Sequence, residues 1–166
     1  CVRMMGMFEP IILVASGVFY AFFQAAWLKI AGDNIFGLRF PWTIVGALSI
    51  LGAYMLVRRL FGRGPALLVA FLVAGYHYHI HYSRLGLNNI ADPFFVVWAL
   101  YFLVVGVQGG RRWAWAVSGL LAGLAFYFYT GGRQVPVILV GVLVWAALLQ
   151  PDFLRKHRDG LAVMLV

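Results

Sequence analysis

The sequence predicts an all-α, polytopic integral membrane protein, and three observations lead to this prediction. Hydrophobic residues fill 64% of the 166 positions, charged residues fill only 11%, and the mean hydropathy is +0.91. A soluble domain usually carries about 25% charged residues, so this chain cannot cover its surface with charge. Its apolar residues form long runs, and its basic residues gather in alternate connectors between those runs. Since lipid offers backbone amides no hydrogen-bond partner, the runs should be helices.

Several runs are long enough to cross a bilayer, which takes roughly 20 apolar residues and at least about 17. The expected transmembrane helices are, in order, Pro41–Leu60, Pro65–Tyr82, Ile90–Val107, Trp113–Tyr129 and Gln134–Leu149. A further apolar stretch covers Pro10–Ile30, and another span is expected to begin at Leu161. Because the sequence opens on Cys1 and stops within an apolar run, we interpret residues 1–166 as one membrane-domain fragment. Residues 1–40 are its first external loop region, and residues 41–166 are transmembrane helices joined by short loops.

The connectors differ in charge, and this difference predicts the orientation. The segments "RRLFGRG", "GGRRW" and "PDFLRKHRDG" hold eight of the thirteen basic residues. By the positive-inside rule, loops 58–64, 108–112 and 150–160 are cytoplasmic, while loops 77–92 and 130–134 face outward. The protein is therefore expected in the cytoplasmic (inner) membrane as a multi-pass protein. The net charge of +8 is mostly explained by topology, so a nucleic-acid partner is not expected.

The stretch "HYHIHYSRLGLNNIADP", residues 77–93, concentrates polar groups between two apolar runs. If this stretch were helical, five polar residues would share one face of the helix: His77, His81, Arg84, Asn88 and Asp92. Their spacing is i, i+4, i+7, i+11 and i+15. Gly86 is expected to interrupt that helix. Structural roles can explain these residues: Asp92 before Pro93 as an N-cap, Arg84 snorkelling to headgroups, and the histidines and tyrosines in an interfacial belt.

The same polar groups also suit a ligand. A carboxylate, a guanidinium and side-chain amides at a water–lipid boundary match an anionic head carried on a lipid tail, because arginine binds phosphate oxygens in a bidentate manner. A zinc site is not expected from the histidines. His77 and His81 share a helical face and His79 points elsewhere, so two imidazoles give at best half of a tetrahedral site.

Gly119 and Gly123 have the G-x-x-x-G spacing that lets helices approach closely. We interpret this pair as packing against a neighbouring helix of the same protein. No internal repeat or soluble-domain linker is recognisable in the sequence.

Three segments resemble the GT-C superfamily of membrane glycosyltransferases, and in particular its family 39-like group. They are "GDNIFGLRFP" (32–41), "YHIHYSRLGLNNIADPFFVVWALYFL" (78–103, after "RRLFGRGPALLVA") and "GLAFYFYTGGRQVP" (123–136). This group includes protein O-mannosyltransferases, aminoarabinose transferases and RgtA/B/C/D-like transferases. The resemblance covers roughly residues 8–150 and implies the N-terminal part of a GT-C fold. It implies transfer of a sugar from a polyprenyl-phosphate donor, outside the cytoplasmic membrane, to a protein, lipid or glycan acceptor.

The resemblance also assigns expected roles to residues. Asp92 matches the family's second acidic position, and the usual catalytic base is expected upstream of Cys1, so this fragment alone would be inactive. The expected substrate-binding residues are Arg84, Asn88, Asn89, Tyr129 and Arg133. Glu9, in "FEP", is the expected metal or donor contact, although a divalent metal is used by only some members.

The resemblance further implies that Pro10–Ile30 is an external helix at the membrane surface, where Gln24 and Lys29 would meet water. Two other function classes remain open: a transporter or flippase of lipid-linked glycans, and a non-catalytic membrane subunit. Transporters more often place ionisable groups near mid-membrane, whereas here the charges lie at the ends of the spans. The sugar, the acceptor and the oligomeric state are not predicted.

Overall fold

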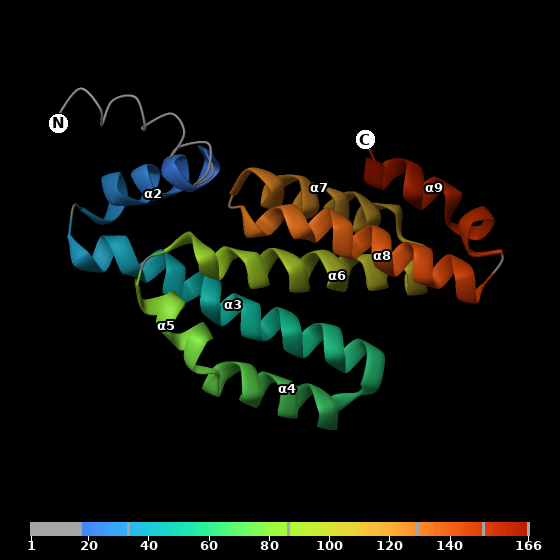
Figure 1. The fold of residues 1–166 in the computed structure, drawn as a ribbon, viewed down its shortest axis with the longest axis horizontal. Coiled ribbons are helices and arrows are strands. Elements are labelled where there is room, and N and C mark those ends of the chain that lie inside the picture. Colours follow the sequence, from blue (N-terminus) through green and yellow to red (C-terminus); the bar gives the residue numbers. More distant parts are fainter. Residues whose placement is uncertain (1–17, 33, 86, 129, 151, 166) are drawn as a thin grey trace.

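The structure is a computed structural model that describes residues 18–32, 34–85, 87–128, 130–150 and 152–165. Every element in these ranges is helical (Figure 1). The α-helices are α2 (Val18–Ala31), α3 (Ile35–Phe61), α4 (Arg63–Gly75), α5 (His77–Leu85), α6 (Ala91–Gly109), α7 (Arg112–Phe128), α8 (Gln134–Leu149) and α9 (Phe153–Leu165). Two short 3-10 helices, η1 (Asn88–Ile90) and η2 (Gly131–Arg133), precede α6 and α8. The all-α prediction is thus confirmed for the described residues.

The bundle packs around α3, α6 and α7, and its outer surface is apolar. Trp42 of α3 and Trp115 of α7 are fully buried in its core. On the outside, Phe71 of α4 and Leu148 of α8 are 76% and 75% exposed. Exposed apolar patches of this kind mark a surface that contacts something other than water. Lipid is the environment that fits helices of this composition.

Three helical segments are long and apolar enough to cross a membrane: Ile35–Phe61, Ala91–Gly109 and Gly131–Leu149. These correspond to the first, third and fifth of the five predicted spans. The second is not one helix, and the fourth forms α7, which at 17 residues is shorter than these three.

The predicted span Pro65–Tyr82 is wrong, because the helix breaks at Tyr76. Tyr76 has an extended backbone (φ −71°, ψ 117°) between α4 and α5. The tertiary contacts of α5 explain the break. A ring nitrogen of His79 lies 3.0 Å from the carbonyl oxygen of Gly46 in α3, and a Cβ added to Gly46 would lie 2.9 Å from Cβ of Ser83. This close approach turns α5 onto α3.

The helix predicted from Pro41 begins earlier, at Ile35. Its N-cap is Asn34, whose side chain accepts a hydrogen bond of 2.7 Å from the backbone N–H of Gly37. Such a cap satisfies one of the free amides at a helix start. Pro41 is then buried inside α3, where its missing N–H leaves one backbone hydrogen bond unmade.

The helix that contains Leu161, where a further span is predicted to begin, starts earlier than the apolar run. Leu161 lies within α9, which begins at Phe153 and packs back along α7. A Cβ on Gly160 would lie 2.5 Å from Nε1 of Trp115, and one on Gly119 would collide with the backbone of Met164. Gly119 therefore packs against a neighbouring helix as predicted, whereas Gly123 faces open space.

The first half of α9 places a histidine between aromatic rings. The ring of His157 lies 4.8 Å from that of Phe153 and 5.8 Å from that of Trp115. Burial, and then the positive charge of Lys156, lowers the pKa of His157 below its ordinary value.

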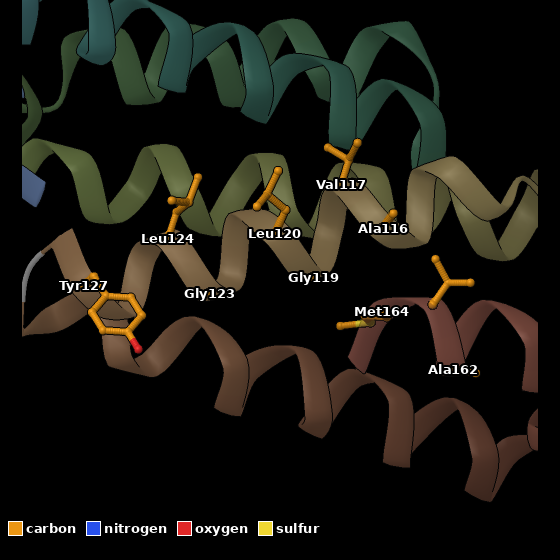
Figure 2. A pocket seen from close by; sticks show the side chains of 10 residues that line it. Ala116, Val117, Gly119, Leu120, Gly123, Leu124, Tyr127, Ala162 and Met164 are labelled. Atoms are coloured by element: carbon orange, nitrogen blue, oxygen red, sulfur yellow. The ribbon is translucent and has the colours of Figure 1, made fainter. Parts of the chain in front are cut away.

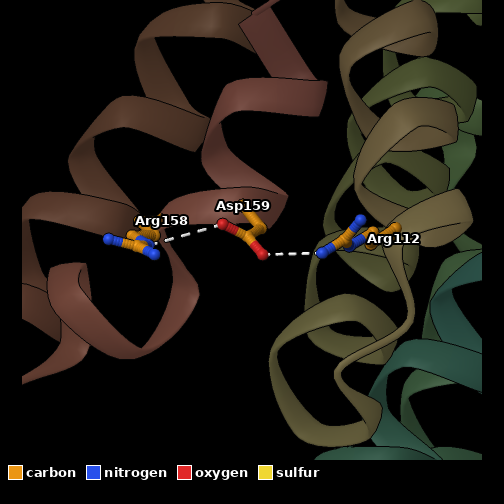
Figure 3. Close-up of polar contacts among 3 residues, drawn as sticks. All are labelled: Arg112, Arg158 and Asp159. Carbon is orange, nitrogen blue, oxygen red and sulfur yellow. Dashed lines mark hydrogen bonds and ion pairs between the residues drawn. The ribbon is translucent and has the colours of Figure 1, made fainter.

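The three basic connectors lie at one end of the bundle. Nε of Arg59 donates to Oε1 of Gln108 at 2.9 Å, which joins the ends of α3 and α6. Arg112 pairs with Asp159 at 2.6 Å and Arg158 lies 3.5 Å from the same carboxylate, which joins α7 to α9 (Figure 3). These pairs are exposed, and such pairs contribute only about 0–1 kcal/mol each. The opposite end of the bundle holds α5, η1 and η2, on the left in Figure 1.

Helix α2 packs on this opposite end through a buried hydrogen bond. Nε1 of Trp42 donates to Oε1 of Gln24 at 2.7 Å. The expectation that Gln24 meets water is therefore wrong, since the side chain is 7% exposed and packed against α3. Lys29 is exposed, as expected. With 14 described residues, α2 is shorter than a membrane span, and residues 10–17 of the predicted Pro10–Ile30 helix lie outside the described residues.

Candidate functional site

The carboxylate of Asp92 lies against the turn that begins η2. A Cβ added to Gly131 would lie 2.8 Å from Cγ of Asp92, 3.3 Å from Oδ1, and in collision with Oδ2. A side chain at this position would displace the carboxylate, because the α-carbon of Gly131 lies directly against it. The start of α6 and the turn before α8 thus meet at one point, at the end of the bundle opposite to the basic connectors.

The predicted N-cap role of Asp92 is wrong. Helix α6 begins at Ala91, and its N-cap is Ile90, which makes no side-chain capping bond. Asp92 lies inside the first turn, because η1 leads directly into α6 and keeps Ile90 in a helical conformation (φ −72°, ψ −16°). A carboxylate in the first turn still interacts favourably with the helix dipole. Its partly buried position beside Gly131, however, is not required by capping.

Arg133 is brought to the same turn. It is the last residue of η2, and its guanidinium carbon lies 5.5 Å from the ring centre of Phe126 in α7. Stacking on an aromatic face leaves the edge of a guanidinium free for hydrogen bonds. Gly132 fixes the turn to α7, since a Cβ there would collide with the carbonyl of Ala125.

Arg84 lies in the last turn of α5 and is exposed. The hydroxyl of Thr43 donates to the carbonyl of Ser83 at 3.2 Å, which ties this turn to α3. No ion pair joins Asp92 to Arg84 or Arg133 within the part of the chain that the structure describes. Within these described ranges, the carboxylate of Asp92 is therefore not neutralised by either arginine.

Of the other predicted site residues, two lie in η1 and two lie outside the described residues. Asn88 and Asn89 both belong to η1, directly before α6, and Asn89 is half-buried. Tyr129 and Glu9 lie outside the described residues. The described ranges contain no group of three or more His, Cys, Asp or Glu side chains that could hold a metal ion.

The histidines separate as the helical spacing predicts. The rings of His77 and His81 stack at 5.9 Å on the exposed side of α5, while His79 is buried against α3. The interpretation of His79 as part of an interfacial belt is wrong, because its side chain packs between helices.

Sequence reasoning missed Gly131 and Gly132 as parts of the site. The dipeptide followed by arginine, in "TGGRQ", was available as a signal. Paired glycines before a helix mark a place where another group approaches the backbone closely. Which group approaches depends on tertiary packing and is not visible in the sequence.

A wide apolar groove of about 980 Å³ runs along α7. Figure 2 shows Tyr127 at one end and Ala162 of α9 at the other, with Gly119 and Gly123 on the α7 surface between them. Tyr127 lies near the end of α7, where the chain leads into η2. The groove therefore extends away from the end of the bundle that holds Asp92.

A family comparison identifies the chain. The sequence model described as dolichyl-phosphate-mannose-protein mannosyltransferase matches residues 15–166. The chain belongs to this family. The match covers all of the described helices, and it confirms the resemblance to GT-C membrane glycosyltransferases.

Similar proteins include undecaprenyl phosphate-alpha-4-amino-4-deoxy-L-arabinose arabinosyl transferases of Pseudomonas. The chain is 32% identical over 102 residues to that of Pseudomonas paraeruginosa (strain DSM 24068 / PA7), covering 57% of this chain and 18% of the relative. It is 33% identical over 102 residues to the second such transferase of Pseudomonas fluorescens (strain Pf0-1), with the same coverage. The chain thus spans less than a fifth of the length of these relatives. No solved structure matches it.

Proposed function

We propose that this chain forms part of a glycosyltransferase that moves a sugar from a polyprenyl-phosphate donor to an acceptor on the outer side of the cytoplasmic membrane. The observation that carries the proposal is the position of the Asp92 carboxylate on Gly131, beside the turn that holds Arg133. Family membership and the names of the Pseudomonas relatives support this class of donor. The charge of the connectors supports the orientation.

The chemistry requires a phosphate group to leave. A hydroxyl or amine of the acceptor attacks the anomeric carbon of the sugar and gives up its proton to a general base. The bond from that carbon to the phosphate oxygen breaks, and polyprenyl phosphate departs with the electron pair. Arg84 and Arg133 are the groups that we assign to the phosphate, because a guanidinium can donate two parallel hydrogen bonds to its oxygens. The edge of Arg133 is free for this role, since its face stacks on Phe126.

Asp92 is assigned to the sugar side of the donor. An ionised carboxylate only accepts hydrogen bonds, so Asp92 can hold a sugar hydroxyl, and it would be a ligand for a divalent cation if one were bound. Asn88 and Asn89, which precede it in η1, can add amide donors and acceptors. The single carboxylate in the first turn of α6 is then the acidic centre of the donor site.

The groove along α7 suits the lipid part of the donor. Its lining is almost wholly apolar, and Tyr127 lies close to the turn that leads to Arg133. A polyprenyl chain laid along Gly123 and Gly119 would leave its phosphate near that turn. Burial of apolar chain surface contributes about 25 cal/mol per Å², so even partial filling would hold the donor.

The distribution of charge favours an enzyme over a transporter. In the three candidate spans the charged residues lie in the first or last two turns: Arg39, Arg58 and Arg59 in α3, Asp92 in α6, and Arg133 before α8. A transport path usually places ionisable groups near the middle of the membrane. Here both ends are polar and the described middle is apolar.

The test is sugar transfer by the purified full-length protein carrying Asp92→Asn. We expect transfer from a polyprenyl-phosphate sugar to fall strongly, while expression and membrane insertion stay normal, because asparagine keeps the size but loses the charge. Asp152→Asn, an exposed aspartate at the other end of the bundle, is the matched control and should leave transfer unchanged. Near-normal turnover of the Asp92→Asn protein would remove Asp92 from the proposed site.

A further inference from the structure

A second polar site lies at the end of the bundle opposite to Asp92. A cleft of about 240 Å³ opens between α3 and α6, lined by Met55, Arg58, Arg59 and Tyr101. Both helices are long and apolar enough to cross the membrane. The cleft is thus a basic pocket between two candidate spans, at the end that the charge of the connectors places in the cytoplasm.

The two guanidinium groups are held in place by neutral partners. Nε of Arg59 donates to Oε1 of Gln108 in α6 at 2.9 Å. The guanidinium carbon of Arg58 lies 5.8 Å from the ring centre of Tyr54, one turn earlier in α3. The contact with Gln108 uses one edge of the Arg59 guanidinium, and the contact with Tyr54 uses the face of the Arg58 guanidinium. The terminal nitrogens of both remain available to an anion.

No described carboxylate neutralises this pair. The ion pairs within the described ranges join Arg112 and Arg158 to Asp159, on α7 and α9. Helix α3 has no acidic residue, and the one acidic residue of α6 is Asp92, near the other end of that helix. Two adjacent positive charges beside a half-buried tyrosine therefore lack a counter-ion that the helices themselves could supply.

We propose that this cleft binds the headgroup phosphate of an anionic glycerophospholipid. Basic pockets between transmembrane helices are suited to such headgroups, and arginine presents donors that match phosphate oxygens. Tyr101 adds a neutral hydroxyl at the cleft wall. The surface beside the cleft suits acyl chains rather than water, since Leu51 and Phe61 of α3 are 45% and 71% exposed. These apolar neighbours favour a lipid phosphate over free phosphate.

Native mass spectrometry of the detergent-purified full-length protein tests this site. Phosphatidylglycerol or phosphatidylcholine is added at equal concentration, and the bound fraction of each is measured for wild type and for Arg58→Gln/Arg59→Gln. The matched control is Arg155→Gln/Lys156→Gln, which removes two exposed charges from α9 at the same end. Thermal unfolding without added lipid establishes that each variant is folded. The measurement needs no sugar donor, so it is independent of the proposed transfer.

We expect wild type and the α9 control to retain phosphatidylglycerol in preference to phosphatidylcholine. In the Arg58→Gln/Arg59→Gln variant, the affinity for phosphatidylglycerol should fall by about ten-fold or more, which is the effect of losing at least one charged hydrogen bond. Millimolar inorganic phosphate should not displace the lipid. Equal loss of bound phosphatidylglycerol in both double variants would show that the lipid is held only by the general positive charge of this end, and would overturn the site. Full displacement of the lipid by inorganic phosphate would overturn the assignment of the site to a lipid.

Discussion

The carboxylate of Asp92 rests on the α-carbon of Gly131, so the first turn of α6 meets the turn before α8 without an intervening side chain. Neither residue needs the other for its local conformation. Asp92 does not cap α6, and Gly131 does not have a positive φ angle. The local structure of the two helix ends therefore does not explain this contact. Its importance can be tested by adding one methyl group at Gly131.

Gly131→Ala should impair transfer by displacing the Asp92 carboxylate. The new Cβ would collide with Oδ2 and lie 2.8 Å from Cγ, and overpacking of this kind typically costs 1–3 kcal/mol. We expect a loss of sugar transfer larger than any loss of thermal stability. Gly141→Ala in α8 is the control, because a Cβ there meets nothing within 4 Å. Equal activity of the two variants would show that the carboxylate position is unimportant.

Arg84 should contribute to donor binding through the fork of its guanidinium. Arg84→Lys keeps the charge but loses the paired donors, so we expect a cost on the order of 1.5–3 kcal/mol, the range for a hydrogen bond to a charged group. This corresponds to roughly ten- to a hundred-fold in kcat/KM. Arg84→Ala should be worse. Transfer is measured with a purified lipid-phosphate sugar.

The histidine control for this series follows from the structure. From the sequence, His79→Ala would be expected to be mild, but His79 is buried and bonded to Gly46, so this change should loosen α5. His77→Ala removes an exposed ring instead and should leave transfer near normal. If Arg84→Ala transfers sugar as well as His77→Ala does, Arg84 only snorkels to the headgroups.

The all-α class and the long helices could be predicted from the sequence because lipid leaves a backbone few alternatives. Apolar runs therefore located α3, α6 and α8 well. The errors arose where tertiary packing competes with local apolarity. Tyr76 lies at the end of an apolar run and inside the predicted span Pro65–Tyr82, yet the chain turns there because Gly46 allows His79 and Ser83 to approach α3. Hydropathy does not record such a contact.

The candidate site was predictable in its residue types and not in its geometry. The cluster from Arg84 to Asp92 was visible as a polar break, and its place at a helix end was inferred from the run that follows. The family resemblance already assigned Arg133 of the partner turn to the site, but the contact of Gly131 with Asp92 was not visible, because Gly131 lies far along the chain and acts through its lack of a side chain. Gln24 was misjudged for a similar reason, since its partner Trp42 belongs to another helix.

Gln24→Leu should destabilise the packing of α2 on α3. The change removes the acceptor of the 2.7 Å bond from Nε1 of Trp42, and loss of a buried hydrogen-bond partner costs about 1–3 kcal/mol. We expect a lower midpoint of thermal unfolding in detergent. Gln150→Leu makes the same chemical change at an exposed position and should have little effect. An unchanged midpoint for Gln24→Leu would show that the bond adds nothing to stability.

The orientation is tested by cysteine labelling in intact cells, in a background where Cys1 is replaced by serine. Single cysteines at Arg63, Arg111 and Arg155 should be shielded from an impermeant thiol reagent, because the basic connectors are predicted to be cytoplasmic. Single cysteines at Leu87 and Thr130 should be labelled.

The structure guides the choice of these labelling positions. All five side chains are exposed. The glycines next to them are less suitable, since Gly62 and Gly110 have positive φ angles of 92° and 62°, and Gly132 packs on Ala125. A cysteine at any of these glycines would strain the backbone or the packing. Altered labelling could then result from a distorted fold and not from the side of the membrane on which the residue lies. Labelling at Arg63, Arg111 and Arg155 together with protection at Leu87 and Thr130 would show that the orientation in the membrane is opposite to the predicted one. Asp92 would then lie in the cytoplasm, and transfer on the outer side would be excluded.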